Sequence, residues 1–192
     1  MLEWKSQEKA ITQEEEGACK REIKAIQKEL AALQQPIKQA GLPVLLVFEG
    51  WSASGKGSII SKVISELDPR GYQVWSYADP TDEEGRRPLL WPFWRDLPPR
   101  GEMAVLDRSW YSRALTRLEE DQAAASGLVE SINTFERQLG DDGYLILKFF
   151  LNISRREQKR RLEKLSDHGA TAWRVTDRDW SCLLYTSDAA DE

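Results

Sequence analysis

The stretch PVLLVFEGWSASGKGSII, residues 43–60, contains the pattern that decides the fold. Its first half is a continuous apolar run that ends in glycine, which is typical of a strand buried on both faces. Its second half places Gly50, Gly55 and Lys56 at the spacing of a phosphate-binding loop, between that strand and an apolar-periodic helix. In this context we expect backbone N–H groups, the helix N-terminus and the lysine to bind phosphate. The structural alternative is a glycine-rich turn that only joins strand to helix.

One position of the predicted loop departs from ordinary nucleotide-binding loops. Such loops carry Ser or Thr after the lysine, and its hydroxyl binds the magnesium ion. Here that position is a glycine, so other groups would have to hold the metal. The predicted loop comprises Gly50, Trp51, Ser52, Ala53, Ser54, Gly55, Lys56 and Gly57.

Three further apolar runs, separated by helical patterns, predict the rest of a sheet. Strands that alternate with helices indicate an α/β fold with a parallel sheet flanked by helices. Helical periodicity is clear at residues 59–67 and 129–139, the latter followed by Gly140 and a DDG turn. The three runs are YQVWSYA (72–78), EMAVLD (102–107) and YLILKFFLNI (144–153).

The N-terminal segment predicts an amphipathic helix, because apolar residues recur at spacings of three and four until Pro36 intervenes near its end. We expect this helix to pack on its own domain, and a coiled-coil dimer arm is the alternative. The apolar positions are Cys19, Ile23, Ile26, Leu30, Leu33 and Ile37.

Length and composition limit the possible classes of protein. The chain has 192 residues, which suits one well-buried domain, and a formal net charge of -5. This charge argues against a sequence-independent nucleic-acid partner, which needs a basic surface. The two cysteines lack metal-ligand spacing, no apolar run reaches membrane length and the N-terminus is charged, so we expect a soluble cytoplasmic protein without a membrane partner. Residues 181–192 fit no preceding pattern, and we interpret them as a non-native tail.

The third predicted strand ends in Asp107, which Arg108 follows directly. A carboxylate at the carboxyl end of a central strand is where this architecture holds magnesium or phosphate. The alternative is that Asp107 only caps the next helix. Because an arginine follows and other arginines surround it, we favour the functional role.

Arginines, without any lysine, fill the segment from residue 86 to residue 117. Arginine forks bind phosphate oxygens in pairs, but ion pairs with neighbouring acidic residues would explain several of them. The tryptophans Trp91, Trp94 and Trp110 are expected in the core rather than on a base, and His168 is expected to be exposed. The arginines are Arg86, Arg87, Arg95, Arg100, Arg108, Arg113 and Arg117, and for Arg86, Arg95, Arg100 and Arg117 we favour the ion-pair explanation.

A series of motifs in a fixed order resembles the polyphosphate kinase 2 family, especially its polyphosphate:AMP phosphotransferase branch. The resemblance runs from about residue 43 to residue 180 and implies a P-loop kinase core with a helical lid. It divides the chain into an N-terminal helical segment (1–40), a P-loop domain incomplete at its C-terminus (41–180) and the tail. The motifs are FEGWSASGKG, LDPRGY, PTDEEGRRPLLWPFW, LDRSWYSRAL, INTFERQL, LKFFLNISRREQKRRL and TAWRVTDRDW.

The resemblance also implies a reaction and a set of site residues. The reaction is magnesium-dependent transfer of a phosphoryl group from inorganic polyphosphate to AMP or another nucleotide, by a chain that can self-associate. Lys56 and the loop amides would bind the transferring phosphates, and Asp107 would position Mg2+ and the acceptor. Arg108 would steady the transferred group. Arg113 and, from the lid side, Arg161 match basic positions that reach phosphates.

Three departures from the family pattern leave an alternative open. Ser52 stands where the family usually has an Asp that organises the metal, Pro92 interrupts the usual LWRFW sequence, and the family domain continues beyond the final Asp-Trp pair. The alternative is therefore a catalytically reduced half of a tandem protein that binds polyphosphate or a nucleotide. An ATP-using nucleoside monophosphate kinase is disfavoured, because its loop would carry Ser or Thr at Gly57.

Overall fold

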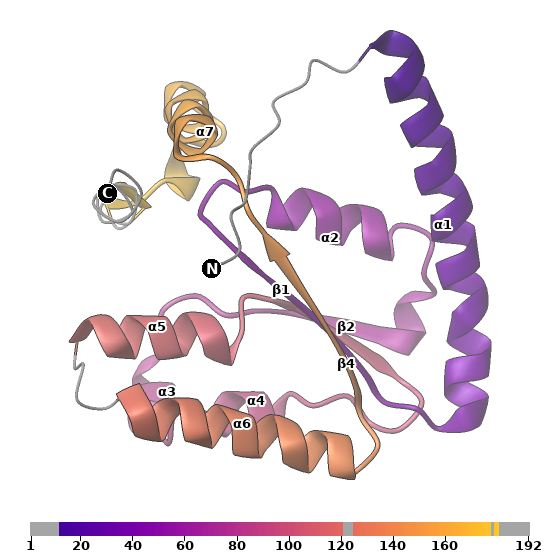
Figure 1. The fold of residues 1–192 in the computed structure, drawn as a ribbon, viewed down its shortest axis with the longest axis vertical. Helices are drawn as coiled ribbons and strands as arrows, with labels where there is room; N and C mark the ends of the chain where they lie inside the picture. The colour runs from indigo at the N-terminus through magenta and orange to yellow at the C-terminus, as the bar shows by residue number, and fades with distance from the viewer. Residues whose placement is uncertain (1–11, 121–124, 178, 181–192) are drawn as a thin grey trace. The chain divides into compact units, whose positions relative to one another are not determined.

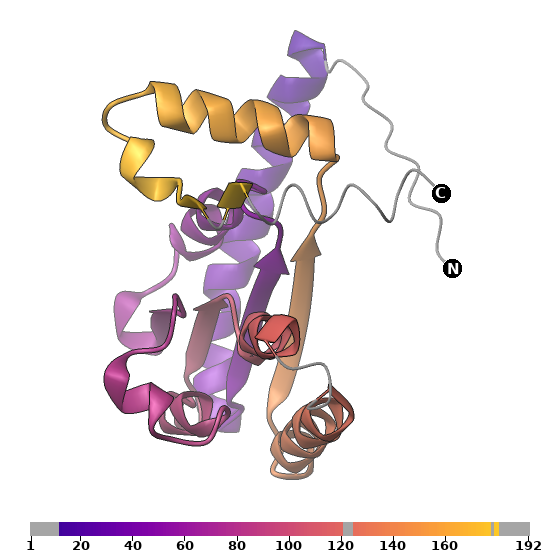
Figure 2. The same ribbon diagram turned by 90° about the vertical axis from the view of Figure 1, so that its left-hand side faces the viewer.

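Four strands form one parallel sheet in the order β2-β3-β1-β4. β1 and β2 both pair in parallel with β3, and the register aligns Phe48 with Asp107 and Ser76 with Asp107. Figure 2 shows β4 running in the same direction as β1. All four predicted strands are thereby confirmed, as is the α/β class. The strands are β1 (Val44–Gly50), β2 (Tyr72–Ser76), β3 (Met103–Asp107) and β4 (Leu145–Leu151).

The structure is a computed structural model that describes residues 12–120, 125–177 and 179–180. The proposed tail at 181–192 lies outside these residues. No helix among the described residues is both long enough and apolar enough to cross a membrane. The described residues fold into two compact units: the larger contains residues 12–49, 56–120 and 125–150, and the smaller contains residues 50–55, 151–177 and 179–180.

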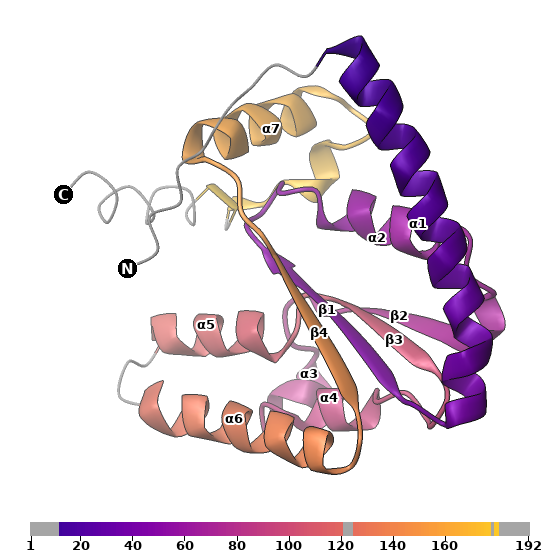
Figure 3. The same ribbon diagram turned by 45° about the vertical axis from the view of Figure 1, so that its right-hand side comes forward.

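Helices cover both faces of the sheet in the larger unit. Helices α1 and α2 lie on one face, and α3 to α6 lie on the other (Figure 1, Figure 3). The helices of this unit are α1 (Gln13–Ala40), α2 (Lys56–Ile64), α3 (Asp82–Gly85), α4 (Trp91–Arg95), α5 (Trp110–Glu120) and α6 (Ala125–Asp141), with a 3-10 turn, η1, at Pro69–Gly71.

The core forms between the sheet and the face covered by α3 to α6. Trp110 is fully buried, and its ring meets the rings of Phe93 and Phe135 edge-on at 5.6 and 5.0 Å between centroids. Burial of such large aromatic side chains contributes most to the stability of a core. The expected core role is confirmed for Trp110, whereas Trp94 remains 44% exposed although it contacts Phe135 edge-on.

Helix α1 packs on its own unit, as expected, mainly through polar contacts. The Gln27 amide donates to the Lys62 carbonyl and the Ser65 hydroxyl at 2.7 and 2.9 Å. The helix has no fully buried residue, and it continues through Pro36 to Ala40. It ends because Gly41 adopts the left-handed conformation, with φ of 61°, and its N–H caps the Ile37 and Lys38 carbonyls.

Two other boundaries differ from expectation for local reasons. Gly140 lies inside α6 rather than ending it, and the left-handed residue of the following turn is Gly143, with φ of 87°. Pro92 lies within α4, but in its first turn, where its missing N–H has no helical partner to lose. It is also fully buried, so it contributes to packing.

The smaller unit contains the loop Gly50–Gly55, helix α7 (Arg155–Asp167) and a 3-10 turn, η3 (Ala172–Arg174). Ser154 caps α7 by accepting the Glu157 amide at 3.2 Å. The loop begins at Gly50, whose φ is 138°, and a side chain there would place Cβ 2.4 Å from the Leu151 carbonyl oxygen. The entrance to the loop therefore requires glycine.

A Gly50→Ala substitution should destabilise the protein by at least about 1–3 kcal/mol, because it combines a disfavoured φ with a backbone clash. Gly140→Ala is the matched control: the site is helical, with nothing within 4 Å of the added Cβ. It should stabilise the protein by about 0.5–1 kcal/mol. Urea unfolding of the two variants measures both changes, and equal stability of the two would contradict the tight contact at Gly50.

Candidate phosphate site

The predicted phosphate loop has an unusual backbone conformation. Ala53 has φ of 57° and Gly55 has φ of 98°, so the chain turns through left-handed conformations on both sides of Ser54. The Ser54 amide donates to the Trp51 carbonyl at 3.1 Å and closes the turn. Ser54 is only 7% exposed, and its hydroxyl has no hydrogen-bond partner among the described residues.

Lys56 is the first residue of α2 and is 8% exposed. Its position joins a positive side chain to the positive end of a helix, which favours anions. The next residue, Gly57, has ordinary helical φ and no atom within 4 Å of a hypothetical Cβ. Glycine is thus not required there by backbone or packing, in contrast to Gly50.

The turn after β3 places a second set of predicted residues beside the carboxyl end of β1. Asp107 ends β3 opposite Phe48, and the Arg108 amide donates to the Phe48 carbonyl at 2.9 Å. Arg108 has φ of 67°, a conformation that non-glycine residues rarely adopt and that costs about 1–2 kcal/mol. Residues held in this region cluster at functional sites. The strain supports a functional role for this turn.

The structure also weighs against Asp107 as a simple helix cap. Helix α5 begins at Trp110, and the Ser109 hydroxyl accepts the Tyr111 amide at 3.2 Å. Ser109 therefore takes the role that the alternative gave to Asp107. The Asp107 carboxylate is half-buried and forms no ion pair with any described residue.

Glu49, the residue before the loop, ties β1 to the start of α5. It is 8% exposed, and its carboxylate accepts from the Ser109 and Ser112 hydroxyls at 2.7 and 2.6 Å and from the Ser112 amide at 3.3 Å. Buried carboxylates require such donors, because desolvation is otherwise expensive. Sequence analysis missed this role, since acidic residues at strand ends are common and the partners lie sixty residues away.

A further network fixes the other side of α5. Glu136 on α6 accepts from the Trp110 indole at 3.0 Å, from the Tyr111 hydroxyl and from Lys148 at 2.8 Å. Lys148 comes from β4, so three elements meet at one carboxylate. The residues of INTFERQL and LKFF that carry the family resemblance thus serve to position α5.

Arg113, expected to reach phosphate, has a protein partner in this structure. It donates to Glu84 at 2.8 Å, and both side chains are nearly buried, at 12% and 11% exposure. Burial opposes ionisation of Glu84, but hydrogen bonds from Arg113 and the Thr81 amide outweigh it and lower the pKa of that carboxyl. The Arg113 Nε remains buried without a hydrogen-bond partner among the described residues. Arg113 would have to exchange Glu84 for a phosphate in order to bind one.

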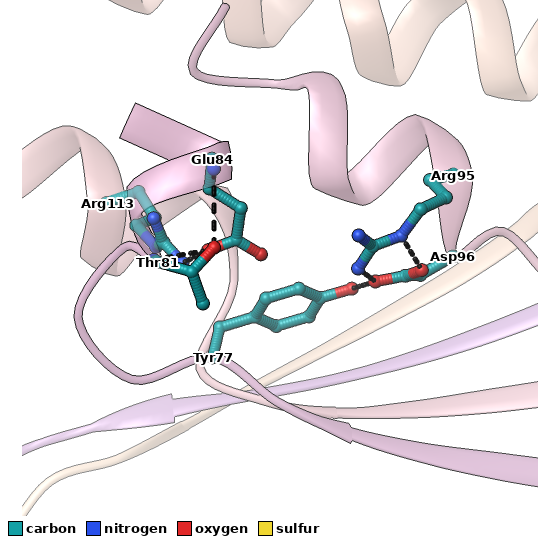
Figure 4. A network of polar contacts seen from close by, with 6 residues as sticks. All are labelled: Tyr77, Thr81, Glu84, Arg95, Asp96 and Arg113. Carbon is teal, nitrogen blue, oxygen red and sulfur yellow. Dashed lines mark hydrogen bonds and ion pairs between the residues drawn. The ribbon is translucent and has the colours of Figure 1, made fainter. Parts of the chain in front are cut away.

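Figure 4 shows the Arg113–Glu84 pair next to a second buried contact, between Tyr77 and Asp96. The Tyr77 hydroxyl donates to Asp96 at 3.0 Å, and Asp96 is also held by Arg95. Burial, together with the adjacent Asp96 charge, raises the pKa of Tyr77 far above its usual range. The hydroxyl is therefore a fixed donor at any pH the fold survives, and it holds the α4 end against β2.

Several of the remaining arginines form the ion pairs that composition suggested. Arg87 pairs with Glu83, Arg95 with Asp96, and Arg100 with Asp142. Trp91 contacts the guanidinium groups of Arg87 and Arg95, each 5.0 Å from its ring centroid. The side chains of Asp82, Glu83, Arg86 and Arg87 line a surface hollow of about 450 Å³. By contrast, Arg108 forms no ion pair with any described residue. His168 is exposed, as expected.

Arg161 contacts the loop itself within the smaller unit. Its guanidinium donates to the Ser54 carbonyl at 3.0 Å, the Ala53 carbonyl at 3.3 Å and the Glu157 carboxylate at 2.6 Å. The Trp51 indole donates to Asn152 at 2.8 Å, which is a second side-chain contact between loop and the β4-α7 segment. The family resemblance predicted that Arg161 reaches phosphates from the lid side, and it did not show that the arginine binds the loop backbone.

The described residues contain no group of three or more His, Cys, Asp or Glu side chains placed to hold a metal ion. A protein-built metal cage is therefore absent from the described part of the chain. An ion that takes most of its ligands from phosphates and water needs only one or two carboxylates. Asp107 can supply one, because the Glu49 carboxylate is already engaged by two serines.

A parallel sheet with a glycine-lysine loop after β1 and a carboxylate at the end of β3 defines a P-loop kinase-like fold. The family model for polyphosphate kinase 2 matches residues 13–184. The chain belongs to the polyphosphate kinase 2 family.

Relatives and solved structures agree with this assignment. The polyphosphate:AMP phosphotransferase of Pseudomonas aeruginosa is 36% identical over 86% of this chain and 34% of its own length. The Pseudomonas syringae pv. tomato protein of that name is 38% identical over 71% of this chain and 28% of its own length. The crystal structure of polyphosphate kinase 2 from Arthrobacter aurescens TC1 matches with a TM-score of 0.79 at 33% identity, covering 86% of this chain and 62% of that one. The chain thus spans about a third of the length of these Pseudomonas relatives.

The strain at Arg108 generates a testable difference between two substitutions. Arg108→Gly removes both the side chain and the left-handed strain, whereas Arg108→Ala removes the side chain but retains Cβ. The glycine variant should be about 1 kcal/mol more stable than the alanine variant, although glycine normally destabilises. Urea unfolding checks this order, and a more stable alanine variant would show that Arg108 is not strained.

Proposed function

We propose that this chain transfers the terminal phosphoryl group of inorganic polyphosphate to AMP or to another nucleoside mono- or diphosphate. The observation that carries the proposal is the buried Lys56 at the start of α2. The loop before it contains residues with positive φ, and Gly57 follows it. The names of the relatives, polyphosphate:AMP phosphotransferase and AMP/ADP-polyphosphate phosphotransferase, support this donor and these acceptors.

Each site residue has a defined part in the proposed reaction. Lys56 and the loop amides bind the polyphosphate end. The Ser54 hydroxyl, which has no hydrogen-bond partner among the described residues, is a group that a bound phosphate would satisfy. Arg108 has no competing ion pair with any described residue, so its fork can neutralise the transferred group. Arg113 joins it if Glu84 is exchanged for phosphate. These groups stabilise charge rather than form covalent bonds with the substrate.

The bond changes are those of a direct displacement. An oxygen of the acceptor phosphate attacks the terminal phosphorus of polyphosphate, a new P–O bond forms, and the bridging P–O bond breaks in line with it. The products are ADP, when AMP is the acceptor, and polyphosphate shortened by one unit. Alignment of the two substrates and neutralisation of the equatorial oxygens supply the rate enhancement.

We propose Mg2+ as the cofactor, with Asp107 as its protein ligand. A half-buried carboxylate that forms no ion pair within the described part of the chain fits this hard cation, which keeps several waters and takes its other ligands from substrate phosphates. When bound, the ion would neutralise phosphate charge. Ser52 would contribute no charge here, in contrast to the Asp that the family usually has.

Location and assembly remain predictions from the sequence. Cys19 is exposed and forms no disulfide with any described residue, in keeping with the reducing, cytoplasmic setting that the sequence predicts. Self-association, and the absence of nucleic-acid and membrane partners, stay predictions as well.

A second candidate function rests on Ser52. Without the carboxylate at this position, the chain would be a reduced half that binds polyphosphate or nucleotide beside an active domain. The relatives that are about three times as long, of which this chain covers 34% and 28%, leave room for such a domain.

Lys56→Ala should lower the rate of ADP formation from polyphosphate and AMP by about 100-fold or more, as expected when a preorganised charge is lost from the transferring group. Lys62→Ala is the control, because Lys62 lies on the same helix but is exposed. Chromatographic quantification of ADP measures both. Activity that survives in Lys56→Ala would refute the proposed role of the loop.

The Ser52→Asp variant distinguishes the two candidate functions, an active phosphotransferase and a catalytically reduced half. The second candidate predicts that this change raises ADP formation at least about tenfold over an inactive or nearly inactive parent, because it restores a metal-organising charge. Ser52→Asn has the same size without the charge and should give no gain. Equal rates for parent and Ser52→Asp would count against the reduced half.

A further inference from the structure

We infer that Arg161 is a positioning residue that holds the backbone of the phosphate loop, rather than a group that contacts phosphate. This inference rests on the proposed function, because it concerns the same loop. The fork of Arg161 is already engaged: Nε donates to Glu157 at 2.6 Å, and Nη1 donates to the carbonyls of Ala53 and Ser54 at 3.3 and 3.0 Å.

The geometry of the peptide group explains why these carbonyls matter. In a planar trans peptide the C=O and the following N–H point in opposite directions. Arg161 binds the Ser54 carbonyl, so it directs the Gly55 N–H away from itself. The Ser54 N–H, in the neighbouring peptide, is fixed by the Trp51 carbonyl at 3.1 Å. Arg161 thereby orients the Gly55 N–H, one of the loop amides that we propose to bind phosphate.

The loop needs such a restraint because its conformation is intrinsically unfavourable. Ala53 has φ of 57°, in a region where L-residues other than glycine are strained. Gly55, with φ of 98°, is free to adopt many conformations and would not fix the turn. The guanidinium lies against this part of the loop: a Cβ at Gly55 would be 3.6 Å from Nη1. The Arg161 guanidinium at the Ala53 and Ser54 carbonyl oxygens stabilises the loop conformation in which both oxygens point toward the arginine.

Glu157 in turn holds the arginine. Its carboxylate accepts from Arg161 and, at 2.7 and 2.6 Å, from Arg160. These two guanidinium groups lower the pKa of Glu157 to about 2, so the carboxylate stays ionised throughout the working pH range. Arg161 and Glu157 lie one turn apart on α7, which presents the arginine in a single orientation.

The chain provides a matched control for this arrangement. Arg160 is adjacent to Arg161 and pairs with the same carboxylate, but its side chain is 63% exposed, compared with 37% for Arg161. Arg160→Ala removes an equal charge from the same helix and leaves the bonds from Arg161 to the loop in place. Any effect of lost positive charge alone should therefore appear in both variants.

The test is hydrogen exchange of the loop amides, followed by mass spectrometry without substrates. Arg161→Ala should speed exchange in peptides covering Gly50–Gly55 by about tenfold or more while β1 and β3 exchange as before, because a local restraint is lost without global unfolding. Arg160→Ala should leave loop exchange unchanged. Unchanged loop exchange in Arg161→Ala would overturn the inference, whether or not the chain makes ADP.

Steady-state kinetics distinguish a positioning role of Arg161 from direct phosphate binding by a second, independent measurement. For a positioning role, Arg161→Ala should lower kcat about tenfold or more and change KM for polyphosphate by less than about threefold, because the misplaced amides act in the transition state. Arg161→Lys should not restore kcat, because an ammonium group cannot join Glu157 and two carbonyls as a fork does. A large rise in KM that lysine reverses would instead identify Arg161 as a phosphate ligand and overturn the inference.

Discussion

The buried carboxylate of Glu49 is the contact on which the arrangement of the larger unit's site residues depends. It joins the last buried residue of β1 to Ser109 and Ser112 at the start of α5. Because β1 and β3 are parallel and Phe48 is aligned with Asp107, the turn that carries Arg108 is fixed beside the carboxyl end of β1. Desolvation makes an unpaired carboxylate costly there, so the two serines are needed for the fold as well as for the site.

Features that follow from local pattern were predictable from the sequence. The strand runs, the glycine-lysine loop and the buried Trp110 depend on periodicity, glycine spacing and side-chain size, and all appear in the structure. The partners of Glu49 and Arg113, and the loop carbonyls that Arg161 binds, were not predictable, because only tertiary folding brings these groups near. A sequence shows that Arg161 is basic, but not that it binds backbone carbonyls.

The strained backbone conformations were also not predictable, because the residue types at these positions do not indicate a positive φ. Ala53 and Arg108 occupy left-handed conformations that their sequences disfavour, and both lie in segments predicted to bind phosphate. Local rules fail most often where function imposes a geometry. Pro92 gives the opposite lesson: its departure from the family sequence appeared disruptive, but the first turn of α4 accommodates it without loss of a hydrogen bond.

The central claim is that Lys56 and Arg108 act on the same phosphoryl group. A crystal structure of the chain with Mg2+ and a short polyphosphate tests it most directly. We expect the Lys56 ammonium and the Arg108 guanidinium within hydrogen-bond distance of one terminal phosphate, with Asp107 facing the metal ion. Polyphosphate bound instead at the hollow lined by Arg86 and Arg87, with Lys56 not in contact, would contradict the claim.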